Sequence, residues 1–159
     1  MSDNTYIRML IESQEKKLVL LDEAIELDEE QIRLVQEEDP NMDILDESLE
    51  RKGKIVEELD RLDDGFESVY AKVREELLNN KEAHRDEIKR LQELITLITE
   101  KSVKVQAAEL RGKETVERFL KRKRTALRES KSTVKAANAY AVNMRKMNKI
   151  DAFFVDKKK

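Results

Sequence analysis

Apolar residues recur at alternating steps of three and four along three long stretches of this chain, and this spacing constrains the fold more than any other feature. It places the apolar side chains on one stripe of a helix, which is the heptad pattern of coiled coils. The pattern is interrupted at EEDPNMD, residues 37–43, and at the pair Asn79 and Asn80. Because proline suits the first turn of a helix and asparagine suits a helix end, both places predict a break between helices.

We therefore predict an all-α protein, an elongated antiparallel three-helix coiled coil over residues 1–119 with helices at about residues 4–37, 40–78 and 81–119. The predicted core includes Val56 and Tyr70 on the second helix and Ile95 on the third. Composition favours the same fold, because 42% of the residues are charged, 4% are aromatic and three are Gly. Such a chain has little material for a compact globule and few places where a helix must stop.

Three charged residues interrupt the apolar seams: Asp28, Lys52 and Glu109. In an antiparallel helical hairpin, the residue numbers of any two facing positions add up to the same sum. The register that pairs the apolar residues in this way places Lys52 opposite both acidic residues. We predict a structural polar layer of these three side chains that fixes the register of the helices. The alternative is that all three side chains extend past the core to solvent.

The C-terminal part of the chain has the opposite charge to the rest. Residues 1–110 contain 16 Lys and Arg against 30 Asp and Glu, a net charge of −14, whereas residues 111–159 contain 16 against 5, a net charge of +11. A helical pattern continues past the predicted coiled coil, so residues 120–148 are predicted to form a basic helical extension. The sequence leaves open whether this extension projects or folds back as a fourth helix over the acidic part. Residues 149–159 are predicted to be a flexible tail, because Asn148 and Asp151 favour turns.

The residue types that most enzymes use in catalysis are scarce. The chain has no Cys, a single His (His84) and no Gly-rich loop, so we expect no enzyme activity and no cofactor or metal site, and we expect His84 at the surface. The basic run KRKR, residues 121–124, has no interleaved aromatic residues, so no nucleic-acid binding is expected. No stretch reaches the roughly 18 apolar residues of a membrane span, which predicts a cytoplasmic protein without membrane insertion.

Two phrases carry a resemblance to a known family: LDDGFESVYAKVREELLNN, residues 62–80, and NAYAVNMRKMNKIDAFFVDKKK, residues 138–159. The D-x-G-F-E-x-x-Y pattern in the first, and the Tyr, Met, final aromatic, Asp and lysines of the second, resemble FlgN-type flagellar export chaperones of clostridium-like Gram-positive bacteria. The resemblance implies a cytoplasmic, non-enzymatic chaperone. It would bind disordered terminal segments of hook–filament junction proteins and bring them to the flagellar type III export gate or its ATPase complex, using its C-terminal region to bind the partner.

In this chain the C-terminal region holds a thin stripe of apolar and small residues suited to capture an amphipathic helical segment of a client. The predicted client-binding residues are Val116, Leu120, Leu127, Val134, Ala137, Tyr140, Ala141 and Met144. Phe153 and Phe154 are predicted to form a docking motif in the tail, or instead to pack on the chain's own helices. The competing hypothesis is a structural or oligomerising coiled coil without a secreted client, with a possible homodimer zipped through residues 116–147.

Overall fold

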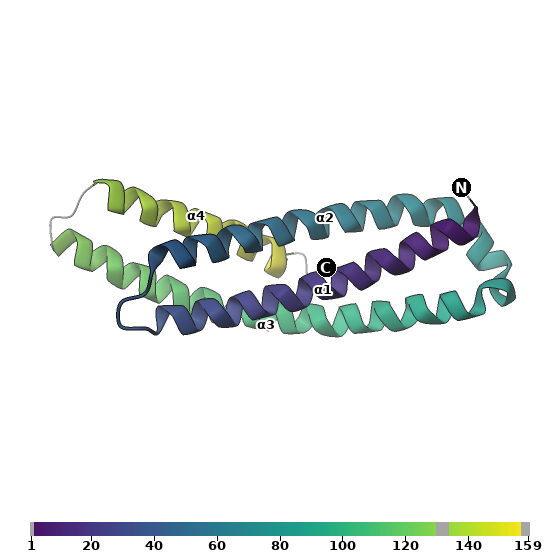
Figure 1. Ribbon diagram of the computed structural model, residues 1–159, viewed down its shortest axis with the longest axis horizontal. Coiled ribbons are helices and arrows are strands. Elements are labelled where there is room, and N and C mark those ends of the chain that lie inside the picture. The colour runs from purple at the N-terminus through teal and green to yellow at the C-terminus, as the bar shows by residue number, and fades with distance from the viewer. Residues whose placement is uncertain (1, 130–133, 157–159) are drawn as a thin grey trace. The chain divides into compact units, whose positions relative to one another are not determined.

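The computed structural model describes residues 2–129 and 134–156, and within them the side chains of residues 2–126, 138 and 141–155. Every regular element in this part of the chain is helical, so the predicted all-α class is confirmed. Figure 1 shows the four α-helices: α1 (Asp3–Val35), α2 (Met42–Asn79), α3 (Arg85–Glu129) and α4 (Val134–Asp156), with a single 3₁₀ turn, η1 (Lys81–His84), before α3.

The break between α1 and α2 lies within EEDPNMD, residues 37–43, where Pro40 predicts it. α1 ends at Val35, and α2 begins at Met42 rather than at Pro40 as predicted. Asn41 acts as the N-cap, because its Oδ1 accepts a hydrogen bond of 2.9 Å from the backbone N–H of Asp43. The cap satisfies one of the amide groups that the first turn of a helix leaves without a partner.

The chain forms two compact units, and α1, α2 and α3 each contribute a segment to both. Unit 1 comprises Met1–Glu23 and Glu57–Val103, and unit 2 comprises Ala24–Val56 and Lys104–Lys159.

Unit 1 packs the beginning of α1, the end of α2 and the beginning of α3 around an apolar cluster. The cluster consists of Ile7, Leu10, Val73, Leu77 and Leu91. Ion pairs also join the helices of this unit: Lys17 Nζ on α1 lies 2.7 Å from Asp63 Oδ1 on α2, and Lys101 Nζ on α3 lies 2.6 Å from Asp22 on α1. The pairing of Lys17 with Asp63 is the one that an antiparallel α1–α2 register gives.

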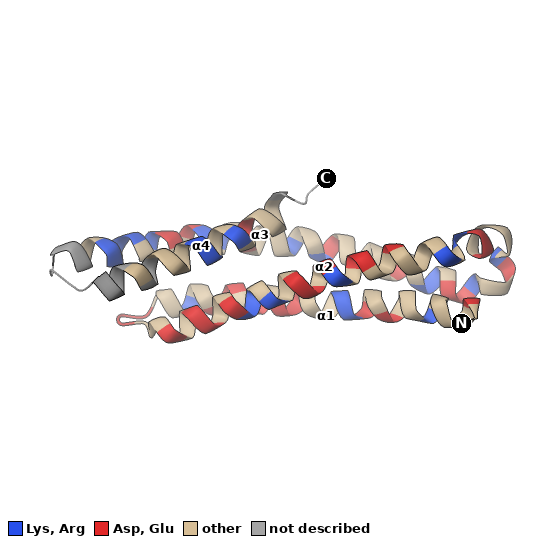
Figure 2. Ribbon diagram, turned by 90° about the horizontal axis from the view of Figure 1, so that it is seen from above, with Lys and Arg blue, Asp and Glu red and all other residues tan. Residues whose placement is uncertain are grey.

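Unit 2 adds a fourth helix. Its buried apolar residues come from all four helices and include Leu45, Leu49, Ile55, Val105, Val116, Phe119, Leu120, Met147, Ile150 and Phe154. Gln31 Nε2 on α1 donates a hydrogen bond of 2.8 Å to Ser48 Oγ on α2, again in antiparallel register. Figure 2 shows many acidic residues of unit 2 on α1 and α2 and many basic residues on α3 and α4, and Lys146 of α4 pairs with Asp46 of α2. The opposite charges of the two parts of the chain are therefore partly paired within this unit.

Three predicted segments have different boundaries in the structure. The third helix does not end near residue 119, because α3 continues to Glu129. The predicted extension 120–148 is not one helix, because α4 begins at Val134 and folds back in unit 2. The predicted flexible tail is wrong for residues 149–156, which belong to α4.

The predicted seams are correct in period but misplace some members. Ile55 and Leu94 are fully buried, whereas the predicted Ile95 is 48% exposed and Tyr70 is 36% exposed. Val56 is only half-buried. The reason is geometrical: a helix packed against two neighbours buries a stripe wider than one seam, and an error of one residue turns a side chain by about 100°.

Candidate functional site

The predicted polar layer lies in unit 2, where three helices bring its members together. Lys52 Nζ on α2 is 2.5 Å from Asp28 Oδ1 on α1 and 2.6 Å from Glu109 Oε1 on α3. The exposed fraction of the side chain is 3% for Lys52 and 1% for each carboxylate. The side chains therefore do not extend to solvent, which was the alternative that the sequence left open. Gly112 packs against Asp28, since a Cβ at this glycine would lie 3.6 Å from Asp28 Oδ1.

Asp151 on α4 adds a third acidic group to this cluster. Its carboxyl group hydrogen-bonds with Glu109, and its Oδ2 lies 3.9 Å from Lys113 Nζ on α3. Asp151 is 4% exposed. α4 thus contacts the polar layer directly, and the buried cluster contains three carboxyl groups around a single buried ammonium group.

Three carboxyl groups cannot all ionise beside one lysine in a buried site without a large cost. Burial raises the pKa of Glu109 to about 9, although attraction to Lys52 opposes this rise. Burial also raises the pKa of Asp151, more than the hydrogen bond from Glu109 lowers it. For Lys52, burial by itself would lower the pKa, but attraction to Glu109 and Asp28 outweighs burial and raises it. At neutral pH Lys52 is therefore cationic, and Glu109 keeps a proton that it can donate to a neighbouring carboxylate.

α4 packs through a stripe with helical spacing. Asn143, Met147, Ile150 and Phe154 are all less than 10% exposed and recur at steps of four, three and four. Beside this stripe, Lys146 Nζ donates hydrogen bonds to Asp46 Oδ1 at 2.7 Å and to Glu50 Oε1 at 3.0 Å, one turn apart on α2. The hydrogen bond to Asp46 is the main cause of a raised pKa at Lys146.

The fit of α4 leaves two buried oxygen atoms without hydrogen bonds. Among the described residues of α4, these atoms are Asn143 Oδ1 and Asp151 Oδ2, and Asp28 Oδ2 in the polar layer also lacks a partner. An unsatisfied buried polar atom costs on the order of 1–3 kcal/mol, so the two atoms of α4 weaken the attachment of this helix.

The predicted client-binding residues do not form one surface. Val116 and Leu120 are buried in unit 2, Met144 is half-buried and Ala141 is exposed. On α4, Ala141 and Met144 lie beside the buried stripe rather than in it, so their predicted role in client binding stays a prediction. The side chains of four further predicted residues, Leu127, Val134, Ala137 and Tyr140, lie outside the described part of the chain.

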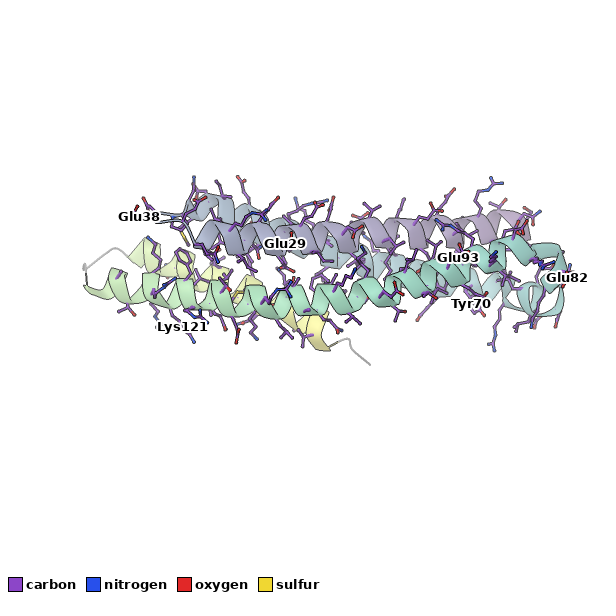
Figure 3. The ribbon with its side chains drawn as sticks, turned by 90° about the horizontal axis from the view of Figure 1, so that it is seen from below. Glu29, Glu38, Tyr70, Glu82, Glu93 and Lys121 are labelled. Carbon is purple, nitrogen blue, oxygen red and sulfur yellow. The ribbon has the colours of Figure 1, made fainter. Side chains whose placement is uncertain are left out.

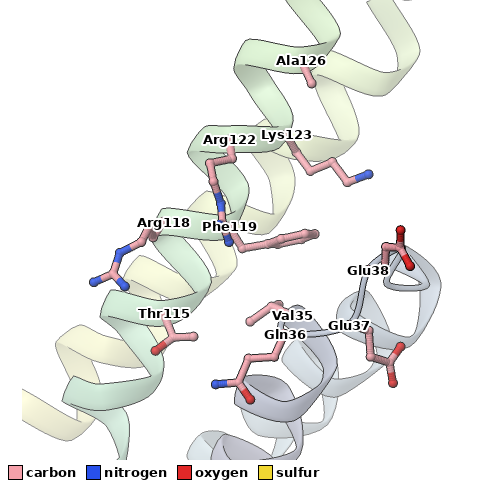
Figure 4. A pocket seen from close by; sticks show the side chains of 10 residues that line it. All are labelled: Val35, Gln36, Glu37, Glu38, Thr115, Arg118, Phe119, Arg122, Lys123 and Ala126. Atoms are coloured by element: carbon pink, nitrogen blue, oxygen red, sulfur yellow. The ribbon is translucent and has the colours of Figure 1, made fainter.

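A groove in unit 2 opens beside the predicted residues, between the end of α1 and the later part of α3. It has a volume of about 620 Å³ and is lined by Val35, Gln36, Glu37, Glu38, Thr115, Arg118, Phe119, Arg122, Lys123 and Ala126. In Figure 4 the ring of Phe119 extends from α3 toward the end of α1, where Val35 lies. The same view shows the amine of Lys123 and the carboxylate of Glu38 on the side of the groove near the α1–α2 loop. The groove therefore combines an apolar floor with a basic wall on α3 and an acidic wall at the loop.

The two tail phenylalanines are part of the packed helix. Phe154 is 7% exposed and Phe153 is half-buried, with their ring centroids 5.3 Å apart in an edge-to-face arrangement. The proposed docking motif in a free tail is therefore wrong for these residues, and the alternative, packing on the chain's own helices, is what the structure shows. Asp151 does not start a turn here, because burial against the polar layer outweighs its weak preference for turns.

His84 is buried, contrary to the expectation from sequence. Its side chain is 8% exposed, and its Nε2 lies 3.0 Å from Glu76 Oε1 at the turn between α2 and α3. Hydrogen bonds from Asn80 and His84 lower the pKa of Glu76.

Across residues 2–129 and 134–156, no group of three or more His, Cys, Asp or Glu side chains is arranged to hold a metal ion. In the same residues, no helix is both long and apolar enough to cross a membrane.

The contribution of Asp151 to the polar layer was missed in the sequence. The available signal was the spacing of Met147, Ile150 and Phe154, which identifies one face of a helix with Asp151 at its edge.

Comparisons of this chain with family models, with curated proteins and with solved structures give no match.

Proposed function

We propose that this protein is a cytoplasmic flagellar secretion chaperone of the FlgN type, which binds hook–filament junction proteins before type III export. The sequence resemblance in residues 62–80 and 138–159 suggests the family. The single structural observation that supports a binding role is the groove in unit 2. Its volume of about 620 Å³ and its apolar floor at Phe119 and Val35 suit the anchor side chains of an amphipathic segment.

The groove places the proposed client site at the exposed side chains of Arg118, Arg122 and Ala126, above a floor formed by the buried Val35 and Phe119. Val116 and Leu120 are buried, so they support the groove from behind rather than contact a client. Phe119 lies between them in the sequence and lines the groove. We propose that a disordered terminal segment of the client folds as a helix there, with acidic side chains toward Arg118 and Arg122. The ordering cost of that segment predicts transient rather than permanent binding.

The proposed architecture is an antiparallel three-helix coiled coil with α4 as a fold-back fourth helix. The interhelical contacts of both units support an antiparallel register. The packing of unit 2 does not support the competing hypothesis, a coiled-coil homodimer formed through residues 116–147. Val116, Leu120 and Met147 would have to leave its core to form that dimer.

A binding experiment with matched charge reversals tests the proposal. The labelled terminal segment of a junction protein is titrated with the full chain and followed by fluorescence anisotropy. Arg118→Glu with Arg122→Glu should weaken binding about tenfold, which is 1.4 kcal/mol. The control, Lys121→Glu with Arg124→Glu, makes the same change at exposed positions of α3 that do not line the groove. Absence of binding by the unmodified chain contradicts the chaperone function, and equal loss in both double variants contradicts the groove as the site.

A second pair of substitutions tests the predicted C-terminal stripe. Leu127→Asp with Val134→Asp should abolish client capture if the stripe takes part, while leaving helicity unchanged. Retained capture by this variant, together with loss in the groove variant, would confine the site to the groove. Secretion of junction proteins by cells carrying each variant measures whether capture is needed for export.

A further inference from the structure

An acidic stripe lies along α2 in unit 1. It consists of Glu57, Asp60, Asp64 and Glu67, which recur at steps of three, four and three and are all exposed. Like charges at these spacings lie on neighbouring turns of one helix face and destabilise the helix by a few tenths of a kcal/mol per pair.

Apolar residues lie near the acidic stripe on α2 and at the heptad position of α3 that Glu109 holds in unit 2. Phe66 and Tyr70 on α2 form a stacked pair with ring centroids 6.1 Å apart, and Tyr70 is 36% exposed. Figure 3 marks Tyr70 among the side chains of unit 1. On α3, Ile95 is 48% exposed, and the hydroxyl of Thr99 is turned back to donate a hydrogen bond of 2.9 Å to the Ile95 carbonyl oxygen. We call the acidic stripe together with Phe66, Tyr70, Ile95 and Thr99 the unit 1 face.

The corresponding positions in unit 2 are covered by a helix. Asp46 and Glu50 occupy the same heptad positions of α2 as members of the acidic stripe, and Lys146 of α4 bridges both of them. Glu109 occupies the heptad position of Ile95 on α3, and it is buried where Asp151 of α4 hydrogen-bonds with it. In unit 2, this side of α2 and α3 therefore packs a helix with an apolar stripe and a lysine beside it. Unit 1 contains no such fourth helix among its described residues.

We propose that the unit 1 face binds a basic amphipathic helix of a partner protein. The partner helix has apolar residues at steps of three and four, which cover Tyr70 and Ile95. Its lysine or arginine side chains lie beside this stripe and reach the acidic stripe, as Lys146 reaches Asp46 and Glu50. The negative charge repels an anionic membrane and nucleic acid, and so favours a protein helix over both. This site is separate from the proposed groove in unit 2 and goes beyond client capture.

The test uses a designed 18-residue peptide with Leu at steps of three and four and Lys at the flanking positions. Its fluorescence anisotropy is measured with the full chain at low salt. Saturable binding is expected, with affinity that falls as NaCl rises from about 50 to 300 mM because the charges are exposed. Asp64→Lys with Glu67→Lys should weaken binding at least tenfold. The control, Glu12→Lys with Glu15→Lys, reverses two exposed acidic residues at the same spacing on α1 and should leave affinity within twofold.

A second variant separates helix docking from simple charge attraction. Tyr70→Ser with Ile95→Gln removes the apolar contacts at partly exposed positions, and helicity by circular dichroism checks that the chain still folds. Binding should weaken at least fivefold, and a photo-crosslinking group in the peptide should label residues 64–70 and 92–99. Unchanged affinity in this variant, equal loss in the α1 control, or crosslinks confined to unit 2 would overturn the proposal. Binding to anionic lipid vesicles in preference to the peptide, or peptide-independent dimers formed through this face, would also overturn it.

Discussion

Replacing Lys52 by Met removes the only buried ammonium group of the described polar cluster and leaves its carboxyl groups in place. Lys52 Nζ lies 2.5 Å from Asp28 and 2.6 Å from Glu109, and all three side chains are at most 3% exposed. Deleting one partner of such a buried ion pair typically costs about 3–5 kcal/mol, because the remaining charge has neither solvent nor counter-charge. For a chain of 159 residues, at about 2–4 °C per kcal/mol, the melting temperature should fall by about 10 °C.

Circular dichroism at 222 nm during heating and urea unfolding measures this loss. Lys54→Met is the matched control, because Lys54 is two residues away on α2 and exposed, so its replacement should change stability by less than about 0.5 kcal/mol. The destabilisation by Lys52→Met should shrink as pH falls toward 4, since protonation removes the uncompensated carboxylate charge. A loss below 1 kcal/mol at pH 7, or a loss that does not depend on pH, would refute the interpretation that Lys52 neutralises buried carboxylates.

Three further predictions concern the polar cluster, α4 and α2. Because the folded-state pKa of Glu109 is raised to about 9, the folded state binds more protons than the unfolded state above pH 4.5, and this group's contribution to stability falls as pH rises toward 9. The free energy of unfolding of Glu109→Gln, relative to that of the unmodified chain, should therefore rise by at least about 1.4 kcal/mol from pH 5 to pH 9, measured by urea unfolding. An equal dependence of the unfolding free energy on pH in both proteins would contradict the buried proton. Phe154→Ala should cost about 3 kcal/mol, and Phe153→Ala markedly less, because only Phe154 is fully packed; thermal melts of the pair decide, and equal losses would argue against the packing of α4. Gly65→Ala should stabilise α2 by about 1 kcal/mol, since an added Cβ meets nothing within 4 Å; a lower melting temperature would show that the glycine is needed for close approach.

The polar layer illustrates how much the sequence can determine. Asp28, Lys52 and Glu109 were identified from the heptad period and the antiparallel register alone, and the structure brings them together. This inference was possible because helix period and hairpin geometry are local rules that fix which positions face one another. The helical class and the break before Met42 follow from equally local properties, namely the scarcity of Gly and the preference of Pro40 for the first turn of a helix.

The C-terminal helix shows what the sequence did not determine. Asn148 and Asp151 favour turns, and the heptad spacing continues from Leu120, so local rules predicted a helical extension that either projects or folds back, followed by a flexible tail. In the structure Met147, Ile150 and Phe154 are buried in unit 2. Local preferences amount to a few tenths of a kcal/mol per residue, whereas burying one large apolar side chain contributes about 1.5–3 kcal/mol, so packing decided the outcome.

The same distinction applies to the sites. That Asp151 enters the polar layer depends on where α4 packs. That Phe119 and Val35 line one groove depends on how the end of α1 meets α3, and that Ile95 is left partly exposed depends on which helices cover it. Heptad spacing assigns residues to a helix face, but it does not say which face a later helix will cover. Only tertiary packing determines which face is covered. Several helices with a similar amphipathic pattern could pack against the same apolar seam, and the overall fit of shape and charge determines which of them does.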